Sequence, residues 1–158
     1  MALQSAPMIK GTVYENLNLP RSLHGETLSE EEAVNILGDV GLDARFLTHQ
    51  ANELSGGQRQ KVSIARTLIN RSDILLLDEI TSALDRKSCQ EIEQLIRKIN
   101  RQYNVTIIWI THNLRQARNL GDFTWVLNDG QLLEAGESRI LEESTDPVVL
   151  RFVKGDLE

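Results

Sequence analysis

The sequence of 158 residues contains one cysteine, Cys89, and no apolar run that approaches the ~18 residues of a membrane-spanning helix. A single cysteine excludes an intrachain disulfide framework and a cysteine-rich zinc site, and it favours a reducing compartment such as the cytoplasm. The first residues, MALQSAPMIKG, lack the basic lead and apolar centre of a signal peptide. We therefore expect a chain that neither spans a membrane nor carries an export signal.

Positive charge is also scarce. Lys and Arg number 17 against 23 Asp and Glu, so the formal net charge is −6, and no stretch collects the basic residues into a long face. This balance argues against nucleic acid as the main partner. The 41% of hydrophobic residues against 25% of charged ones predicts a globular core in one domain.

Two helices are predicted in the first half of the chain. Ser29 and Glu32 have the spacing of a capping box ahead of an apolar set, which predicts a helix over 29–38. Residues 56–70 form an amphipathic pattern that begins with glycines. The apolar side of this second helix comprises Val62, Ala65 and Ile69, flanked by Ile64 and Leu68, with Arg59, Gln60 and Lys61 largely off it.

A strand, a helix and a second strand follow in the order that is typical of a parallel sheet. The short apolar run at 74–77 predicts a strand buried on both faces, Asp85 is placed to cap a helix near 86–101, and VTIIWI at 105–110 predicts a second buried strand. Parallel neighbours need a long connection, so this order indicates a βαβ crossover in an α/β fold.

The remaining residues predict a small helix, a hairpin and terminal helices. A helix is expected near 113–120, followed by the strand FTWVL, a turn at 128–130, and the strand QLLEAG. Residues 137–153 have the pattern of helices covering a sheet edge, and we find no internal repeat or linker to a second domain.

Asp78 and Glu79 are candidates for chemistry because they end a predicted buried strand. Open α/β sheets bind ligands at this edge. One carboxylate there can hold Mg²⁺ and its neighbour can orient or deprotonate a water, as phosphoanhydride hydrolysis requires. Four apolar residues before an Asp are a weak pattern, and the alternative is that both acids merely end the strand at the surface.

The segment Ser55-Gly56-Gly57-Gln58 precedes the amphipathic helix. A hydroxyl and unobstructed N–H groups at the positive end of a helix dipole suit a phosphate. An ordinary serine cap with a flexible entry turn would have the same local pattern. The segment alone leaves these two interpretations equal.

Three blocks in order, LSGGQRQKVSIARTL, ILLLDEITSALD and THN, closely resemble the signature motif, the Walker B strand with the D-loop, and the switch histidine of the ABC ATPase family. With a weaker match at Gln4, the resemblance covers essentially the whole chain. It implies an α/β, P-loop NTPase-like parallel sheet with a helical subdomain, whose N-terminal strands and Walker A loop are missing. On this basis we expect a partial domain, with the helical and signature region at about 5–70, the Walker B to switch-histidine core at about 71–136, and terminal helices at about 137–158.

The resemblance implies a role for each matched residue. Asp78 resembles the aspartate that supports Mg²⁺, Glu79 the general base, and His112 the histidine that contacts the γ-phosphate of ATP. Ser55, Gly56, Gly57 and Gln58 resemble the signature residues that close over ATP held by an opposite subunit. Asp85 ends the D-loop, which couples the two ATP sites, and Gln4 resembles the Q-loop glutamine beside the Mg²⁺ site. His24, His49 and Cys89 match no functional motif and are interpreted as structural.

No G-x-x-x-x-G-K-[ST] occurs in the sequence, so the backbone cradle and the lysine that hold the β-phosphate are absent. We therefore expect no autonomous hydrolysis. We also expect marginal stability, because a sheet without its N-terminal strands would expose an apolar edge prone to aggregation.

The leading functional hypothesis is an ATP-binding subunit of an ABC transporter, present as a fragment, with ATP and Mg²⁺ as cofactors. The implied partners are a transmembrane permease subunit and a second ATP-binding subunit, identical or different, on the cytoplasmic face of the cell membrane. The stretch GTVYENLNLP and the particular residues within the motifs are similar to those of bacterial ATP-binding subunits of metal-export systems. The alternative is a non-catalytic interaction module that docks on a permease or an intact ATP-binding subunit, and an ABC ATPase of DNA repair or translation is a weaker third interpretation.

Overall fold

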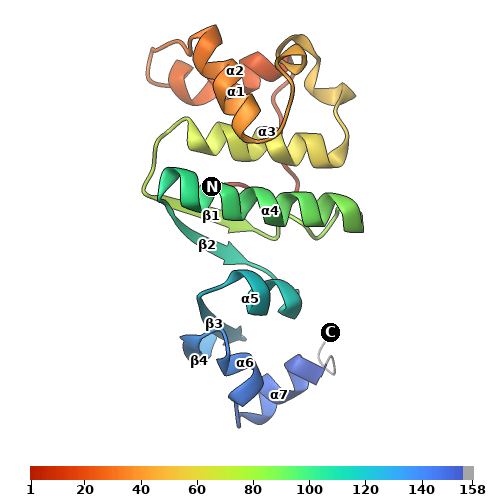
Figure 1. Ribbon diagram of the computed structural model, residues 1–158, viewed down its shortest axis with the longest axis vertical. Helices are drawn as coiled ribbons and strands as arrows, with labels where there is room; N and C mark the ends of the chain where they lie inside the picture. The colour runs from red at the N-terminus through yellow and green to blue at the C-terminus, as the bar shows by residue number, and fades with distance from the viewer. Residues whose placement is uncertain (155–158) are drawn as a thin grey trace. The chain divides into compact units, whose positions relative to one another are not determined.

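The structure is a computed structural model that describes residues 1–154, in two compact units. The first unit, Met1–Ile110, contains α1 (Val13–Ser22), α2 (Glu30–Asp39), the 3₁₀ helices η1 (Ala44–Thr48) and η2 (Ala51–Glu53), α3 (Gly56–Leu68), β1 (Ile74–Asp78), α4 (Arg86–Tyr103) and β2 (Thr106–Ile110) (Figure 1). The second, from Thr111 onwards, contains α5 (Leu114–Leu120), β3 (Phe123–Asn128), β4 (Gln131–Glu137), α6 (Ile140–Glu143) and α7 (Pro147–Lys154).

The βαβ prediction is confirmed. Strand β1 pairs with β2 in parallel, from Ile74 opposite Thr106 to Asp78 opposite Ile110, and α4 makes the connection. On the other side of β1, Ala2 forms a parallel bridge with Leu77. The parallel layer therefore runs from the Ala2 segment through β1 to β2.

The predictions that β1 is buried on both faces and that β2 is a buried strand are wrong. Leu75 and Leu77 are buried, whereas Leu76 between them is 42% exposed. Side chains alternate between the faces of a strand, and within the described residues only one face of the pair packs on the helical core. The other face bears four exposed apolar side chains, Ile74, Leu76, Ile108 and Ile110.

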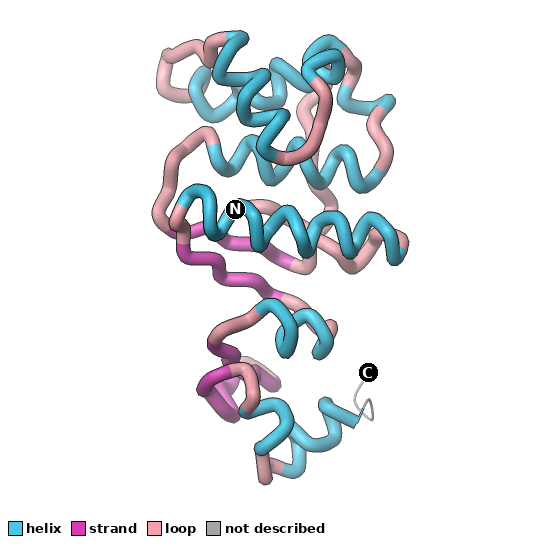
Figure 2. The backbone as a smooth tube through the Cα atoms, in the orientation of Figure 1, coloured by secondary structure: helices cyan, strands magenta, loops and turns pink. Residues whose placement is uncertain are grey.

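Helix α3 is central to the first unit and contacts α1, α2 and α4 (Figure 2). It ends at Leu68, two residues earlier than predicted, and Ile69 is its C-cap. The placement of Gln60 off the buried side is also wrong, because Gln60 is 2% exposed. Its amide donates to the carbonyl of Leu3 at 3.4 Å, so the side chain is buried with a hydrogen-bond partner.

Helix α2 forms where the sequence predicts it, but its capping box is incomplete. The Ser29 hydroxyl accepts from the N–H of Glu32 at 3.1 Å. The Glu32 carboxylate lies 3.4 Å from Arg21 and 3.4 Å from Arg71 instead of returning to the Ser29 backbone. Two guanidinium partners for one carboxylate explain why the reciprocal half of the box is not made.

The second unit contains the predicted hairpin and its helices. Asp129 and Gly130 both have positive φ, 48° and 74°, as a two-residue turn between right-twisted strands requires. Leu141 of α6 and Val149 of α7 are buried with Val126 of β3. These helices therefore bury their apolar side chains in one cluster with the hairpin.

Along the described chain, no helix combines the length and apolar character needed to cross a membrane.

Candidate functional site

Three of the predicted site residues lie at the same end of the parallel layer. Asp78 is the last residue of β1 and Glu79 follows it, both half-buried. Asp78 N–H donates to the Ala2 carbonyl at 3.0 Å, which places the exposed Gln4, two residues further, at the same end of the sheet. Parallel strands share their carboxyl edge, so the pairing of the Ala2 segment with β1 places Gln4 at the same edge as the two acids.

Glu79 has a strained and tightly held backbone. Its φ is +46°, a left-handed conformation that is unfavourable for a residue with a Cβ. Its N–H donates to the Ile110 carbonyl at 3.0 Å, and its carbonyl accepts from the Ser82 N–H at 3.0 Å and the Ser82 hydroxyl at 2.8 Å. Neighbouring groups thus fix the direction in which the Glu79 side chain leaves the strand end.

The predicted phosphate-binding segment begins α3 with a complete capping box. The Ser55 hydroxyl accepts from the Gln58 N–H at 3.3 Å, and the Gln58 side chain accepts from the Ser55 N–H at 2.8 Å. Ser55 and Gly56 are exposed. The first N–H groups of a helix have no intrahelical acceptor, so Gly56 and Gly57 present donors at this end of α3.

This segment packs closely against the residues that start α4. A Cβ built at Gly57 would lie 3.2 Å from the Ser88 hydroxyl oxygen, and one at Gly56 would lie 3.5 Å from a Leu84 methyl carbon. Glycine at 57 therefore permits a close approach between the start of α3 and the start of α4. The glycines are a packing requirement as well as a source of accessible N–H groups.

Asp85 is the N-cap of α4. Its carboxylate accepts from the Lys87 N–H at 3.0 Å, the Ser88 N–H at 3.1 Å and the Ser88 hydroxyl at 2.6 Å. The hydrogen bond from the Ser88 side chain, followed by that from the Ser88 backbone, lowers the pKa of Asp85 below its ordinary value. Asp85 thus holds the start of α4 and the side chain of Ser88, the residue that lies against Gly57 and that the sequence analysis did not single out.

The other titratable candidates belong to the second unit or have local partners. His112 is exposed and belongs to the second unit, between Thr111 and Asn113, the N-cap of α5. His49 has a ring nitrogen 2.9 Å from the Arg45 carbonyl. Burial raises the pKa of the Cys89 thiol, whose sulfur lies 3.3 Å from the Thr81 carbonyl, so that thiol is kept neutral.

Comparison with known proteins decides the family. Residues 3–82, about half of the chain and including Gln4, the signature segment, Asp78 and Glu79, match the family described as ABC transporter. The chain belongs to the ABC transporter family.

Relatives within this family share much of the sequence. An ABC transporter ATP-binding protein of Bacillus subtilis, YjkB, is 49% identical over 87% of this chain and 54% of its own length. The ABC transporter I family member 17 of Arabidopsis thaliana is 38% identical over 98% of this chain and 59% of its own length. The methionine import ATP-binding protein MetN of Staphylococcus haemolyticus is 40% identical over 93% of this chain and 44% of its own length. The chain spans about half the length of these relatives.

Solved structures agree with the α/β cassette fold. The ATP-binding cassette MJ0796, a dimer in a post-hydrolysis state bound to ADP and phosphate, matches with a TM-score of 0.73 and 36% identity over 87% of this chain and 62% of that one. The protein cbiO1 of Clostridium perfringens is part of the ABC transporter complex cbiONQ. It matches with a TM-score of 0.78 and 25% identity over 99% of this chain and 62% of its own.

The residues present fit part of an ABC-type nucleotide site. Among the described residues no three His, Cys, Asp or Glu side chains gather to form a metal cage. Mg²⁺ does not need one, since it commonly takes one or two carboxylates and completes its shell with water and phosphate oxygens, so Asp78 with Gln4 at its edge fits. The start of α3 fits a phosphate. A cradle for the β-phosphate is not among the motifs of this sequence.

Sequence reasoning missed three side chains that shape the site. Ser82 holds the carbonyl of Glu79, Ser88 joins Asp85 to the contact with Gly57, and buried Gln60 ties α3 to the Leu3 carbonyl beside Gln4. Ser82 is part of the segment that resembles the D-loop. No motif or pattern in the sequence pointed to Ser88 or Gln60, because their roles depend on a neighbour far away in the sequence.

Proposed function

We propose that this chain is part of an ATP-binding subunit of an ABC transporter, and that Ser55, Gly56 and Gly57 complete an ATP site held by a second ATP-binding subunit. The observation that carries the proposal is the start of α3. It offers exposed donors at a helix N-terminus and is fixed against α4 through the contact between Gly57 and Ser88. A donor group that must meet a phosphate across a subunit boundary needs such fixed geometry.

The carboxyl edge of the parallel layer is proposed to serve hydrolysis. Asp78, with Gln4 beside it, would hold Mg²⁺, which supplies charge neutralisation to phosphate oxygens. Glu79 is proposed as the base that accepts a proton from the attacking water, and His112 as the side chain that contacts the γ-phosphate. Asp85 is proposed to support the start of α3 by holding the start of α4 in place.

The proposed partners follow from the family. MJ0796 is described as a dimer and cbiO1 as part of a transporter complex. For this chain we propose a second ATP-binding subunit and a transmembrane permease at the cytoplasmic face of the membrane, with ATP and Mg²⁺ as cofactors. The narrower similarity to metal-export subunits remains a prediction, since the permease is expected to select the substrate.

A second candidate is a non-catalytic module that docks on a permease or on an intact ATP-binding subunit. Two observations favour it: the sequence has no phosphate-binding loop, and Ser55 and Gln58 already use their side chains to cap α3. In this alternative the chain would bind its partner but would not change the rate of ATP hydrolysis.

Nucleotide binding and hydrolysis by the purified chain distinguish these functions. The chain is assayed with Mg²⁺ and ATP alone, and then with an intact ATP-binding subunit from the same genome. We expect no hydrolysis by the chain alone and an altered rate in the mixture. The altered rate is expected to be lost with Ser55→Ala and retained with the control variant Arg45→Gln, a change at an exposed side chain of η1. An unchanged rate in the mixture despite binding would favour the docking module.

A further inference from the structure

An ion pair joins α3 to α4 close to the start of α3. The Lys61 ammonium lies 2.8 Å from the Glu91 carboxylate, 30 residues away in the sequence. We propose that this pair is a positioning element, which orients α3 so that the N–H groups of Gly56 and Gly57 point at a phosphate of ATP held by a second subunit. The inference rests on the proposed function, because it assigns two further residues to the same half-site.

The ion pair lies one helical turn beyond the close approach of Gly57 to Ser88. Lys61 follows Gly57 by about one turn of α3, and Glu91 follows Ser88 by about one turn of α4, so each helix presents one face to the other at two successive turns. One contact alone would let the two helices rotate about it. A second contact further along both axes also fixes the direction of α3, and with it the direction of its first N–H groups.

The charges around Glu91 favour the pair. The hydrogen bond from Lys61, followed by the Lys61 charge itself, lowers the pKa of Glu91 below its ordinary value. The charge of Lys87 lowers this pKa further, and that of Asp85 opposes the change. The Glu91 carboxylate is therefore ionised at neutral pH and available to the ammonium group.

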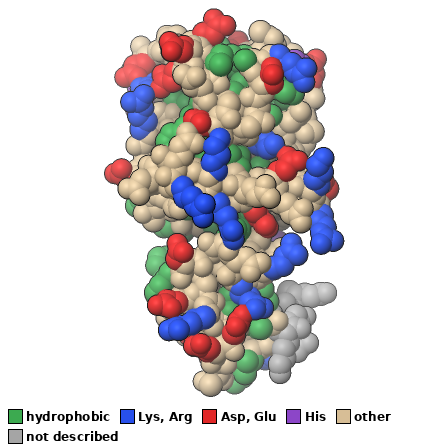
Figure 3. Space-filling model, in the orientation of Figure 1, with side chains coloured by type: hydrophobic (Ala, Val, Ile, Leu, Met, Phe, Trp, Pro, Cys, Tyr) green, Lys and Arg blue, Asp and Glu red, His purple; other side chains and the backbone are tan. Residues whose placement is uncertain are grey.

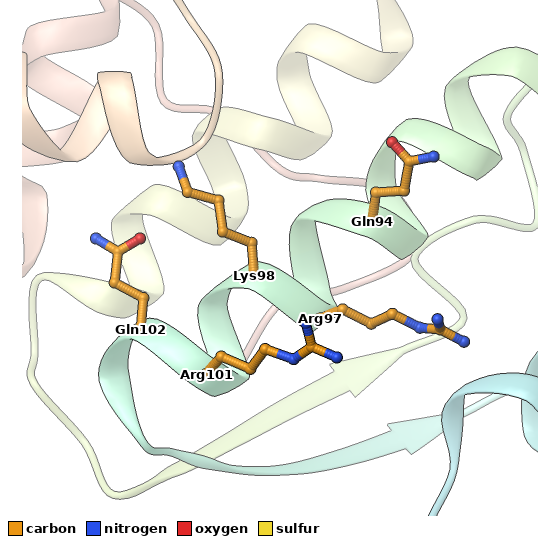
Figure 4. Close-up of a pocket in the computed structure, with 5 residues that line it drawn as sticks. All are labelled: Gln94, Arg97, Lys98, Arg101 and Gln102. Atoms are coloured by element: carbon orange, nitrogen blue, oxygen red, sulfur yellow. The ribbon is translucent and has the colours of Figure 1, made fainter.

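Lys61 differs in exposure from the cations of α4. Figure 3 shows Lys and Arg side chains gathering on the molecular face over this helix, and Figure 4 labels Arg97, Lys98 and Arg101 there. These three residues are exposed, whereas only 16% of the Lys61 side chain is exposed. Water competes less for a charge with so little exposure, so the bond to Glu91 constrains the two helices more than a fully exposed ion pair would.

Substitution at either end tests the orientation directly. Lys61→Met and Glu91→Gln each remove the ion pair at little cost in helix propensity, and Lys61→Glu combined with Glu91→Lys restores it with the charges exchanged. In NMR spectra of the ¹⁵N-labelled chain, both single variants should shift the N–H signals of Gly56 and Gly57, and the exchanged pair should return them towards the wild-type positions. Lys10→Met, which removes an exposed lysine from the same unit, is the control and should leave both signals in place.

Kinetics of the mixture with an intact ATP-binding subunit give the second readout. Each single variant should raise the KM for ATP about threefold at unchanged kcat, the scale of a partly exposed ion pair, because misdirected donors bind phosphate less well in the ground state and the transition state alike. The exchanged pair should restore KM. A pair that only stabilised the fold would instead reduce the amount of active chain, which lowers kcat and leaves KM unchanged.

The two readouts separate this inference from the proposed function. Unmoved Gly56 and Gly57 signals in the single variants overturn the inference, and so does an unchanged KM in a mixture whose rate the wild-type chain alters. If the wild-type chain leaves the rate of the mixture unaltered, the proposed function fails. Glycine signals that shift in the single variants and return in the exchanged pair would still support the orienting role of Lys61 and Glu91.

Discussion

The Tyr103 hydroxyl donates a hydrogen bond to the carboxylate of Asp39, which is 64 residues earlier in the chain. Asp39 ends α2 and Tyr103 ends α4. Gln102 donates to the same carboxylate, and Lys98 donates to the Asp39 carbonyl, where a cation also complements the helix dipole. One residue at the end of α2 therefore collects three side chains of α4 and ties the helical region to the βαβ core.

Replacing Tyr103 by Phe should lower the free energy of unfolding by about 1–2 kcal/mol, because a hydrogen bond to a charged acceptor is lost from a half-buried site. Chemical denaturation measures the change. A double-mutant cycle with Asp39→Ala is the control. We expect the two single changes to be non-additive, and additivity would show that the bond contributes nothing to stability.

The same contact predicts a dependence on alkaline pH. Burial, followed by the hydrogen bond to Asp39, raises the pKa of Tyr103 above its ordinary value. The folded state then holds the phenolic proton more tightly than the unfolded state, so this stabilisation is complete below about pH 10, the ordinary tyrosine pKa, and is lost as the pH rises through the folded pKa. Urea denaturation from about pH 8 upwards should show a steeper loss above about pH 10 for the wild type than for Tyr103→Phe. Parallel curves would contradict the assignment.

Glu79→Gly should raise the free energy of unfolding by about 0.5–1 kcal/mol. The left-handed backbone costs about 1–2 kcal/mol for a residue with a Cβ, and part of that gain is offset by the flexibility of glycine in the unfolded chain. Glu31→Gly, an exposed position inside α2, is the control and should instead lower stability by about 1 kcal/mol. If Glu79→Gly also lowers stability, the strain at this position is absent. In the mixed ATPase assay both Glu79→Gly and Glu79→Gln should abolish any hydrolysis that depends on this carboxylate.

The two glycines at the start of α3 should respond differently to alanine. The Cβ of an alanine at 56 would make ordinary contact with Leu84, whereas at 57 it would crowd Ser88 at 3.2 Å. We expect Gly57→Ala to be less stable than Gly56→Ala by about 1 kcal/mol, since both gain similar helix propensity and only one is overpacked. Thermal unfolding of both variants measures the difference. Equal stabilities would mean that α4 shifts freely to accommodate a methyl group.

Alternate residues of β1 should separate stability from aggregation. Leu77 is 1% exposed and Leu76 is 42% exposed. Leu77→Ala should lower the free energy of unfolding by about 3 kcal/mol by leaving a cavity, whereas Leu76→Ala should change it by less than about 1 kcal/mol. Light scattering of concentrated samples should fall with Leu76→Ala, which reduces the exposed apolar face. If aggregation is unchanged by this variant, a surface other than the exposed face of β1 and β2 causes it.

Local patterns were sufficient for most elements of this chain. The cap at Asp85 predicted α4, in which Ile92, Leu95, Ile96 and Ile99 are buried. The turn at 128–130 predicted the hairpin. These features depend on periodicity and on backbone preferences of residues close together in the sequence. Burial of the β-strands was predicted less well. An apolar run in the sequence does not show whether other elements cover one face of the strand or both.

The sequence by itself determined the family motifs, the parallel βαβ unit and the residue types at the candidate site, because each depends on the spacing of residues that are close together in the sequence. Only the tertiary structure decided that Gln4 joins Asp78 and Glu79 at one sheet edge, that Gln60 is buried, that Glu79 is held in a left-handed conformation, and that Asp39 receives the end of α4. Each of these depends on a partner brought from a distant part of the chain, and hydrogen bonding and packing between distant segments have no periodic signature in the sequence.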